Sequence, residues 1–152
     1  ASQYIDGYAA ETLHWRTLPF ATGVKMTNPE LTVLATGGDG DGYGIGMGHF
    51  IHACKRDLNI TYIVMDNENY ALTTGQASPT TPIWAKTKTT PDGNTSTPFD
   101  PVEMAKQAWC RFATWADSVK FAEMKDIIKE AIKHDGFSLV NIHQACPSYK
   151  RW

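Results

Sequence analysis

The sequence predicts an α/β domain in which a mostly parallel sheet is flanked by helices. Two short apolar segments, residues 31–36 and 60–65, have the composition of buried strands. Between them lie a glycine-rich loop, residues 37–48, and a segment whose apolar residues repeat at i, i+3, i+4 and i+7: Met47, Phe50, Ile51 and Cys54. A strand, a glycine loop, a helix and a second strand form a βαβ unit. The two strands should therefore be parallel, with the loop at their carboxyl edge, where such sheets bind ligands.

The segments before this unit are less regular. Residues 1–18 are polar and aromatic without clear periodicity, and we expect them to form loop and edge structure. Residues 19–26 are compatible with a short helix, and Pro19 suits its first turn.

The segment 67–101 is rich in Thr, Pro, Gly and Asn, which is typical of either a functional loop or a disordered one. Lys86 and Lys88 lie within it, either in a mobile lid or in a solvated loop. Asp100 and Pro101 then have the types favoured at the N-cap and first position of a helix. The expected buried face of that helix comprises Val102, Ala105 and Trp109.

The carboxyl-terminal third contains the clearest amphipathic helix, ended by Gly136. Its apolar stripe comprises Met124, Ile127, Ile128, Ala131 and Ile132. Residues 137–142 predict a final strand, and residues 110–115 a further one.

Length and composition restrict the class of protein. The 152 residues are expected to form a single domain, 1–152, with 42% hydrophobic and 20% charged residues. A net charge of −2 without a Lys/Arg run argues against nucleic-acid binding, and no apolar stretch is long enough for a membrane span. Three widely spaced cysteines and no signal-peptide pattern favour a cytoplasmic location. Five Trp and six Tyr suggest that a partner covers part of the surface.

The glycine loop GGDGDGYGIGMG contains two aspartates and no lysine. Carboxylates beside a phosphate would repel it unless a cation lay between them, so Asp39 is expected to hold a divalent metal and the metal a diphosphate. The common phosphate motifs are absent, and Tyr43 at the third ligand position breaks the EF-hand pattern.

Asn67 strengthens the metal hypothesis. It follows the second strand, and the ends of adjacent strands lie about 5 Å apart, so its side chain and that of Asp39 can reach one ion. Mg²⁺ prefers oxygen ligands of this kind, and the Asn69 carbonyl is a third candidate. The alternative is a tight glycine turn with surface aspartates.

These residues resemble a known family. Gly38-Asp39-Gly40 followed after about thirty residues by an Asn is similar to the thiamine diphosphate fingerprint. The wider sequence resembles the β subunit of 2-oxoacid:ferredoxin oxidoreductases, especially the 2-oxoglutarate type. The matching stretches are LPFATGVK, GGDGDGYGIGMGHFIHA, ITYIVMDNENYALTTGQASPTTP and FDPVEMA.

The resemblance implies a thiamine diphosphate-binding fold and a set of site residues. Mg²⁺ would be bound by Asp39, Asn67 and Asn69, and the diphosphate contacted by Gly38, Gly40 and Asp41. The wall of the cofactor site would continue through Tyr70, Ala71, Leu72 and Thr73. Ser2 and the catalytic candidate His14 match positions near the thiazolium and the substrate.

The family's reaction is the oxidative decarboxylation of a 2-oxoacid to acyl-CoA and CO₂. Its electrons pass through a [4Fe–4S] cluster to ferredoxin, and the partners it implies are an α-type subunit, ferredoxin, coenzyme A and the 2-oxoacid. Cys146 matches one cluster ligand, but the amino-terminal cysteine segment of the family is absent and one thiolate cannot hold a cluster. Trp15 replaces a glycine and Thr74 a lysine common in the 2-oxoglutarate type, so the substrate stays open.

Two other functions stay open: a non-oxidative thiamine diphosphate decarboxylase or synthase subunit, and a non-catalytic Mg-nucleotide-binding subunit. His49 and His52 are expected to be packing or surface residues, with metal binding as the alternative. Cys54 and Cys110 are expected to be buried thiols.

Overall fold

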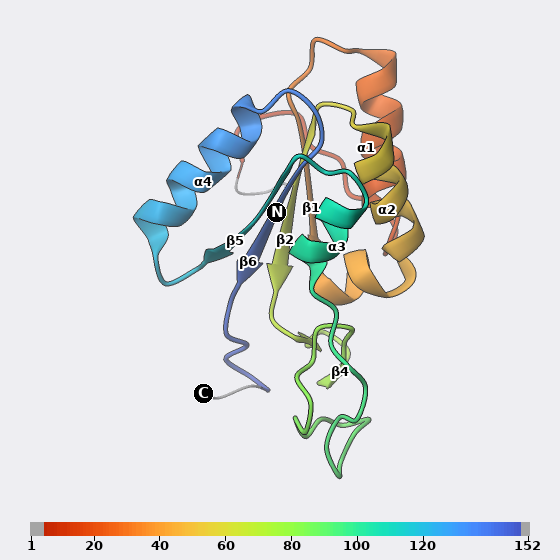
Figure 1. The fold of residues 1–152 in the computed structure, drawn as a ribbon, viewed down its shortest axis with the longest axis vertical. Coiled ribbons are helices and arrows are strands. Elements are labelled where there is room, and N and C mark those ends of the chain that lie inside the picture. The colour runs from red at the N-terminus through yellow and green to blue at the C-terminus, as the bar shows by residue number, and fades with distance from the viewer. Residues whose placement is uncertain (1–4, 150–152) are drawn as a thin grey trace.

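The computed structural model describes residues 5–149 as a parallel sheet with helices on both faces (Figure 1). The strands lie in the order β1-β2-β6-β5, and every neighbouring pair is parallel. Their bounds are Val33–Gly38 for β1, Ile60–Asp66 for β2, Phe112–Asp117 for β5 and Ser138–His143 for β6. The predicted fold class is therefore confirmed.

The hydrophobic core consists of two clusters, one on each side of the sheet. The bounds are Thr17–Thr27 for α1, Met47–Arg56 for α2, Pro101–Gln107 for α3 and Phe121–Lys133 for α4. One apolar cluster joins α1, α2 and α3 to the sheet, with Phe50, Cys54 and Leu139 fully buried. A second cluster lies under α4, where Ala131 packs with Val140 and Ile142. Figure 1 shows α4 and the other three helices on opposite sides of the strands.

The βαβ unit is built as predicted. The register pairs Val33 with Ile60 and Gly38 with Met65, so β1 and β2 end at the same edge. α2 lies between them in sequence and runs back antiparallel to both, so its amino end faces that edge. Between β1 and α2 the chain forms an unpredicted π-helical turn, η2, Gly40–Ile45.

Several predicted boundaries are wrong by two or three residues. β1 begins at Val33, where its pairing with Ile60 starts, and α1 begins at Thr17, which places Pro19 third in the helix. α4 ends at Lys133 rather than at Gly136, whose positive φ of 125° instead turns the chain into β6. Trp109 does not join the buried face of α3. It lies beyond the helix with φ of 67°, and 71% of its surface is exposed.

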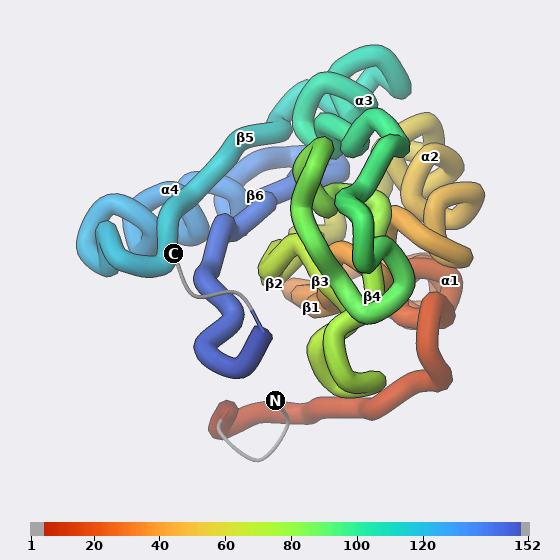
Figure 2. The backbone as a smooth tube through the Cα atoms, turned by 90° about the horizontal axis from the view of Figure 1, so that it is seen from below, coloured from red at the N-terminus to blue at the C-terminus, as the bar shows by residue number. Residues whose placement is uncertain are grey.

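The segment between β2 and α3 lies beyond the carboxyl ends of the strands (Figures 1 and 2). It contains a small antiparallel pair, β3 Asn69–Tyr70 and β4 Gln76–Ala77. Asn94 connects parts of the segment between β4 and α3. Its Nδ2 donates to the Thr81 carbonyl at 2.8 Å, and its backbone pairs with Trp84 and Ala85. Many hydrogen bonds therefore define this loop.

None of the helices within residues 5–149 is both long and apolar enough to cross a bilayer.

Candidate functional site

Two buried carboxylates meet at the carboxyl edge of the sheet. Asp39 follows β1 and Asp66 ends β2, and they are 2% and 1% exposed. Thr80 lies between them, with its Oγ1 2.9 Å from Asp39 Oδ2 and 2.9 Å from Asp66 Oδ1. One hydroxyl hydrogen can satisfy only one of these oxygens at a time. The pair therefore holds more negative charge than this hydroxyl can compensate.

Buried hydrogen bonds from β6 and from the segment after β2 hold the Asp66 carboxylate in place. Asn141 on β6 donates through Nδ2 to Asp66 Oδ2 at 2.9 Å, and Tyr43 donates its hydroxyl to Asn141 Oδ1 at 2.6 Å. The Glu68 backbone N–H donates to Asp66 Oδ1 at 3.1 Å. The site therefore extends from the glycine loop through β2 to β6.

The electrostatics of Asp39 favour a cation. Burial is the main cause that raises the pKa of this carboxyl above its ordinary value of 3.8, and the charge of Asp66 adds to it. Hydrogen bonds from Ser78, Thr80 and the Asn67 backbone oppose the shift without cancelling it. A divalent ion beside Asp39 would stabilise the ionised form.

The two asparagines predicted to bind metal are hydrogen-bonded to each other, and the Asn67 backbone also bonds to the Asp39 carboxylate. Asn67 Oδ1 accepts from the Asn69 N–H at 3.2 Å, and Asn69 Nδ2 donates to the Asn67 carbonyl at 3.0 Å. Asn69 is only 7% exposed, and its Oδ1 accepts no hydrogen bond from residues 5–149. A buried oxygen left unpaired is costly, so this atom points to a ligand.

The donor set has the chemistry of a hard-cation site. Within residues 5–149, no three or more His, Cys, Asp or Glu side chains gather in a way that could hold a metal. What gathers at the edge instead is carboxylate, amide and carbonyl oxygen, which suits Mg²⁺. His49 meets Arg16, with 3.3 Å between His49 Nε2 and Arg16 Nη1.

Glycines let the η2 turn approach its neighbours closely. A Cβ on Gly40 would lie 2.2 Å from the Tyr70 ring, and one on Gly42 would lie 2.4 Å from the Tyr62 hydroxyl. Tyr70 also donates its hydroxyl to the Gly40 carbonyl at 3.1 Å. The turn thus packs against β3 and presents the amino end of α2 to the site, which favours an anion there.

His14 and Asp41 meet at the outer side of this turn. His14 Nδ1 lies 2.8 Å from Asp41 Oδ1, which also accepts the Trp15 backbone N–H. The candidate histidine is therefore held at the glycine loop by its own ion pair. Ser2, the other candidate near the substrate, lies outside the described residues.

The remaining predicted site residues differ in how exposed they are. Gly38 ends β1, and Ala71 is half-buried at the start of the turn after β3. Leu72 is 98% exposed and Thr73 is bonded to Gln76 at the surface, so these two do not line the buried edge.

The three cysteines are reduced and buried. Cys54 and Cys110 are buried thiols in the core, as expected, and the Cys110 thiol donates to the Phe112 carbonyl at 3.1 Å. Cys146 lies just after β6.

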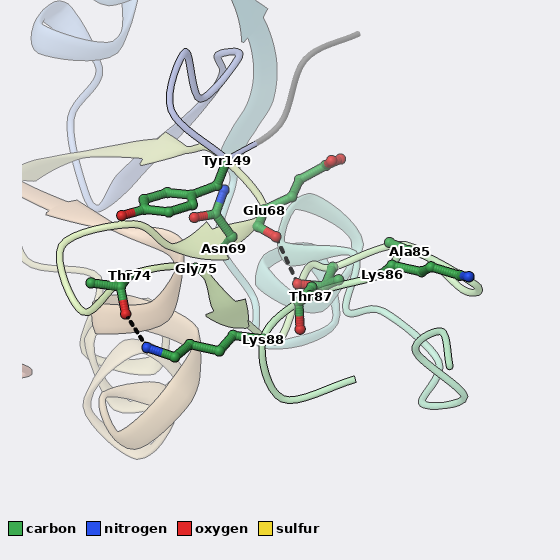
Figure 3. Close-up of a pocket in the computed structure, with 10 residues that line it drawn as sticks. Glu68, Asn69, Thr74, Gly75, Ala85, Lys86, Thr87, Lys88 and Tyr149 are labelled. Carbon is green, nitrogen blue, oxygen red and sulfur yellow. Dashed lines mark hydrogen bonds between the residues drawn. The ribbon is translucent and has the colours of Figure 1, made fainter. Parts of the chain in front are cut away.

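A pocket of about 270 Å³ is lined in part by Asn69 (Figure 3). Its wall includes Glu68 and Asn69 on one side and Thr74 and Lys88 on the other. Lys88 Nζ donates to Thr74 Oγ1 at 2.6 Å.

Sequence reasoning missed Asp66, Thr80 and Asn141. Asn141 carried a signal, because it is a polar residue within an otherwise apolar predicted strand. Thr80 carried none, since it is one of many threonines in an irregular segment and its partners are 14 and 41 residues away.

Comparisons with known proteins place these features in a family. Residues 1–142 match the model of the thiamine pyrophosphate enzyme, C-terminal TPP binding domain. The chain is 43% identical over 150 residues to the 2-oxoglutarate synthase subunit KorB of Archaeoglobus fulgidus, covering 99% of this chain and 56% of the relative. It is 44% identical over 146 residues to 2-oxoacid:ferredoxin oxidoreductase 2, subunit beta, of Aeropyrum pernix, covering 96% of this chain and 47% of the relative.

A solved structure agrees. The 2-oxoglutarate:ferredoxin oxidoreductase of Magnetococcus marinus, with 2-oxoglutarate, coenzyme A and succinyl-CoA bound, superposes with a TM-score of 0.95 at 38% identity. The match covers 98% of this chain and 51% of that one. The chain thus spans about half the length of the relatives it matches.

Proposed function

The chain belongs to the thiamine pyrophosphate enzymes, as their C-terminal TPP binding domain, and on that premise we propose that it binds thiamine diphosphate and Mg²⁺ at the carboxyl edge of β1 and β2. The observation that carries the proposal is the buried Asp39, which bonds to the Asn67 backbone, in a chain that matches the family over residues 1–142.

Predicted residues of the glycine loop and of the segment after β2 have roles in this proposal. Mg²⁺ would be held by the Asp39 carboxylate, the Asn67 side chain and the Asn69 carbonyl, and it would relieve the repulsion between Asp39 and Asp66. Diphosphate oxygens would lie against the turn that contains Gly38, Gly40 and Asp41, at the amino end of α2. Tyr70 holds that turn in place through the Gly40 carbonyl.

We propose that the domain is the cofactor-binding part of a 2-oxoacid:ferredoxin oxidoreductase β subunit, because the Aeropyrum pernix relative, 44% identical over 146 residues, carries that name. Thiamine diphosphate, when bound, supplies the electron sink for decarboxylation of a 2-oxoacid. His14 would handle a proton: its Nδ1 faces Asp41, which leaves Nε2 as the nitrogen able to exchange one.

The rest of the reaction needs other parts of the enzyme. We propose an α-type subunit, a [4Fe–4S] cluster that includes Cys146, ferredoxin as electron acceptor and coenzyme A as acyl acceptor. A single thiolate does not complete a cluster, so the other ligands would come from elsewhere in the enzyme. Three reduced cysteines agree with the cytoplasmic location that we include in this proposal.

The test is electron transfer in the assembled enzyme. A 2-oxoacid together with coenzyme A should reduce ferredoxin only when thiamine diphosphate and Mg²⁺ are present, and iron with acid-labile sulfide should be found in the complex. Release of an aldehyde without reduction of the acceptor would instead identify a non-oxidative decarboxylase. Absence of any reaction that depends on thiamine diphosphate would reject the catalytic proposal.

A further inference from the structure

The irregular segment between β4 and α3 brings one hydroxyl group to both buried carboxylates. Thr80 Oγ1 lies 2.9 Å from Asp39 Oδ2 and 2.9 Å from Asp66 Oδ1, and Thr80 is itself only 6% exposed. Because all three side chains are shielded from water, their geometry is set by the protein rather than by solvent. The hydroxyl therefore determines how far apart the two carboxylates lie.

The turn that carries Thr80 is fixed to the segment after β2. Thr81 Oγ1 donates to the Glu68 carbonyl at 2.6 Å and accepts the Ser78 N–H at 2.8 Å. The Thr81 N–H donates to the Ser78 carbonyl at 3.1 Å, and both residues are buried. Residues 78–81 therefore hold the Thr80 hydroxyl in one place before any ligand binds.

Asp66 is the anchored member of the carboxylate pair. Its Oδ2 accepts Asn141 Nδ2 at 2.9 Å, and its Oδ1 accepts the Glu68 N–H at 3.1 Å. Asn141 is fully buried on β6, so Asp66 is tied to the middle of the sheet. Since both oxygens of Asp66 have other donors, the hydrogen of Thr80 is available to Asp39.

Asp39 is the carboxylate that would bind Mg²⁺ in the proposed function. A metal ligand depends on hydrogen bonds from outer-shell groups, which fix its orientation before the ion arrives. Thr80 has this geometry toward Asp39 Oδ2, and it is not one of the groups proposed as ligands. Its contact with the anchored Asp66 also restricts the movement of Asp39 relative to β2.

We propose that Thr80 is a positioning residue of the magnesium site, whose hydroxyl orients the Asp39 carboxylate and links it to Asp66. The inference rests on the proposed function, because it requires a divalent cation at Asp39. Loss of the hydroxyl would give Asp39 more freedom to rotate, and an ion would then have to order the ligand that it binds. The irregular segment therefore contributes to metal affinity without supplying a metal ligand.

The test measures binding of Mn²⁺, a paramagnetic substitute for Mg²⁺, to the assembled enzyme with thiamine diphosphate present and Mg²⁺ removed. Electron paramagnetic resonance measures the free Mn²⁺, so the Kd is obtained without catalytic turnover. Thr80→Val and the smaller Thr80→Ala remove the hydroxyl, whereas Thr80→Ser keeps it. Thr61→Val is the matched control, because Thr61 is 3% exposed at the other end of β2 and its Oγ1 donates to the Ala131 carbonyl at 3.3 Å.

Thr80→Val and Thr80→Ala should each raise the Kd of Mn²⁺ about tenfold, the lower end of the effect expected when an outer-shell partner is lost. The loss is partial because Ser78 and the Asn67 backbone also bond to Asp39. Thr80→Ser should restore the affinity to within about threefold of the wild type. The spectrum of bound Mn²⁺ should change with Thr80→Val. Thr61→Val should keep the wild-type Kd and spectrum even where thermal unfolding shows a loss of stability.

A wild-type Kd in both Thr80→Val and Thr80→Ala, no recovery in Thr80→Ser, or an equal loss in Thr61→Val would overturn the inference. Failure of the proposed function would look different. The wild-type enzyme itself would then show no binding of Mn²⁺ that depends on thiamine diphosphate, and the inference would fall with it.

Discussion

At the scale of single residues, Asp39 and Asp66 concentrate two carboxylates where the protein has little water. The Thr80 hydroxyl can donate to only one of them at a time, and the charge of Asp66 still adds to the raised pKa of Asp39. Such a pair is stable in the folded chain when one carboxyl is protonated or when a cation lies beside it. We therefore expect that proton binding and the proposed metal binding compete at this site.

This coupling gives a pH prediction for the metal-free chain. The raised pKa means that folded Asp39 keeps a proton that the unfolded chain has lost, so the free energy of unfolding should fall as pH rises above 3.8 through the raised pKa. Asp39→Asn has no such proton to lose. Urea unfolding at a series of pH values should show the fall in the wild type and a smaller one in Asp39→Asn, and parallel profiles would contradict the assignment.

Whether a site residue can be predicted from the sequence depends on how far along the chain it lies from an element with a clear sequence pattern. Asp39 and Asn67 were predictable because each directly follows an apolar strand, and the strand ends meet at one edge. Thr80 and Lys88 come from an irregular segment, and only the folded loop brings them to Asp39 and Thr74.

At the scale of elements, the connection from β1 through η2 to α2 positions the site. Its glycines allow neighbouring side chains to approach the backbone closely. The approach is closest at Gly40, where the Tyr70 ring occupies the space that a side chain would fill. Gly48, the second residue of α2, has open space around its Cα. The connection therefore contains one glycine, Gly40, at which an added methyl group should clash, and another, Gly48, at which it should not.

Gly40→Ala should destabilise the chain by about 1–3 kcal/mol, because the added methyl group displaces Tyr70 from the turn. Gly48→Ala is the matched control and should leave stability unchanged or raise it by up to about 1 kcal/mol. Thermal and urea unfolding measure both effects. Similar stability of the two variants would show that Tyr70 does not pack against the turn as described.

The amino end of α3 allows a second test of local structure. Asp100 accepts hydrogen bonds from the N–H groups of Val102 and Glu103 at 3.1 and 3.0 Å. Asp100→Ala should therefore cost about 1 kcal/mol of unfolding free energy, the typical loss of an N-cap. The exposed Asp92→Ala should stay within about 0.5 kcal/mol of the wild type. Equal effects of the two changes would reject the cap.

Elements were predictable where their signals are local. The α2 face and the Asp100 cap follow from spacing and residue type within a few positions, and both are confirmed. Trp109 was misplaced because periodicity cannot show that α3 ends at Gln107 and that the chain then takes a left-handed conformation. The η2 turn carries no apolar period at all.

At the scale of the whole molecule, the domain has a sheet whose carboxyl edge collects groups from distant segments. The glycine loop, the end of β2, the segment before α3 and β6 all contribute polar atoms there. Large apolar side chains, among them Leu72 and Trp84, are exposed in the segment between β3 and α3.

The most direct test of the central claim is a calorimetric titration of the assembled enzyme with thiamine diphosphate and Mg²⁺, compared with ATP and Mg²⁺. Thiamine diphosphate should bind and ATP should not, and Asp39→Ala should weaken thiamine diphosphate about 100-fold while Asp92→Ala leaves it unchanged. An affinity unaffected by Asp39→Ala, or a preference for ATP, would contradict the account.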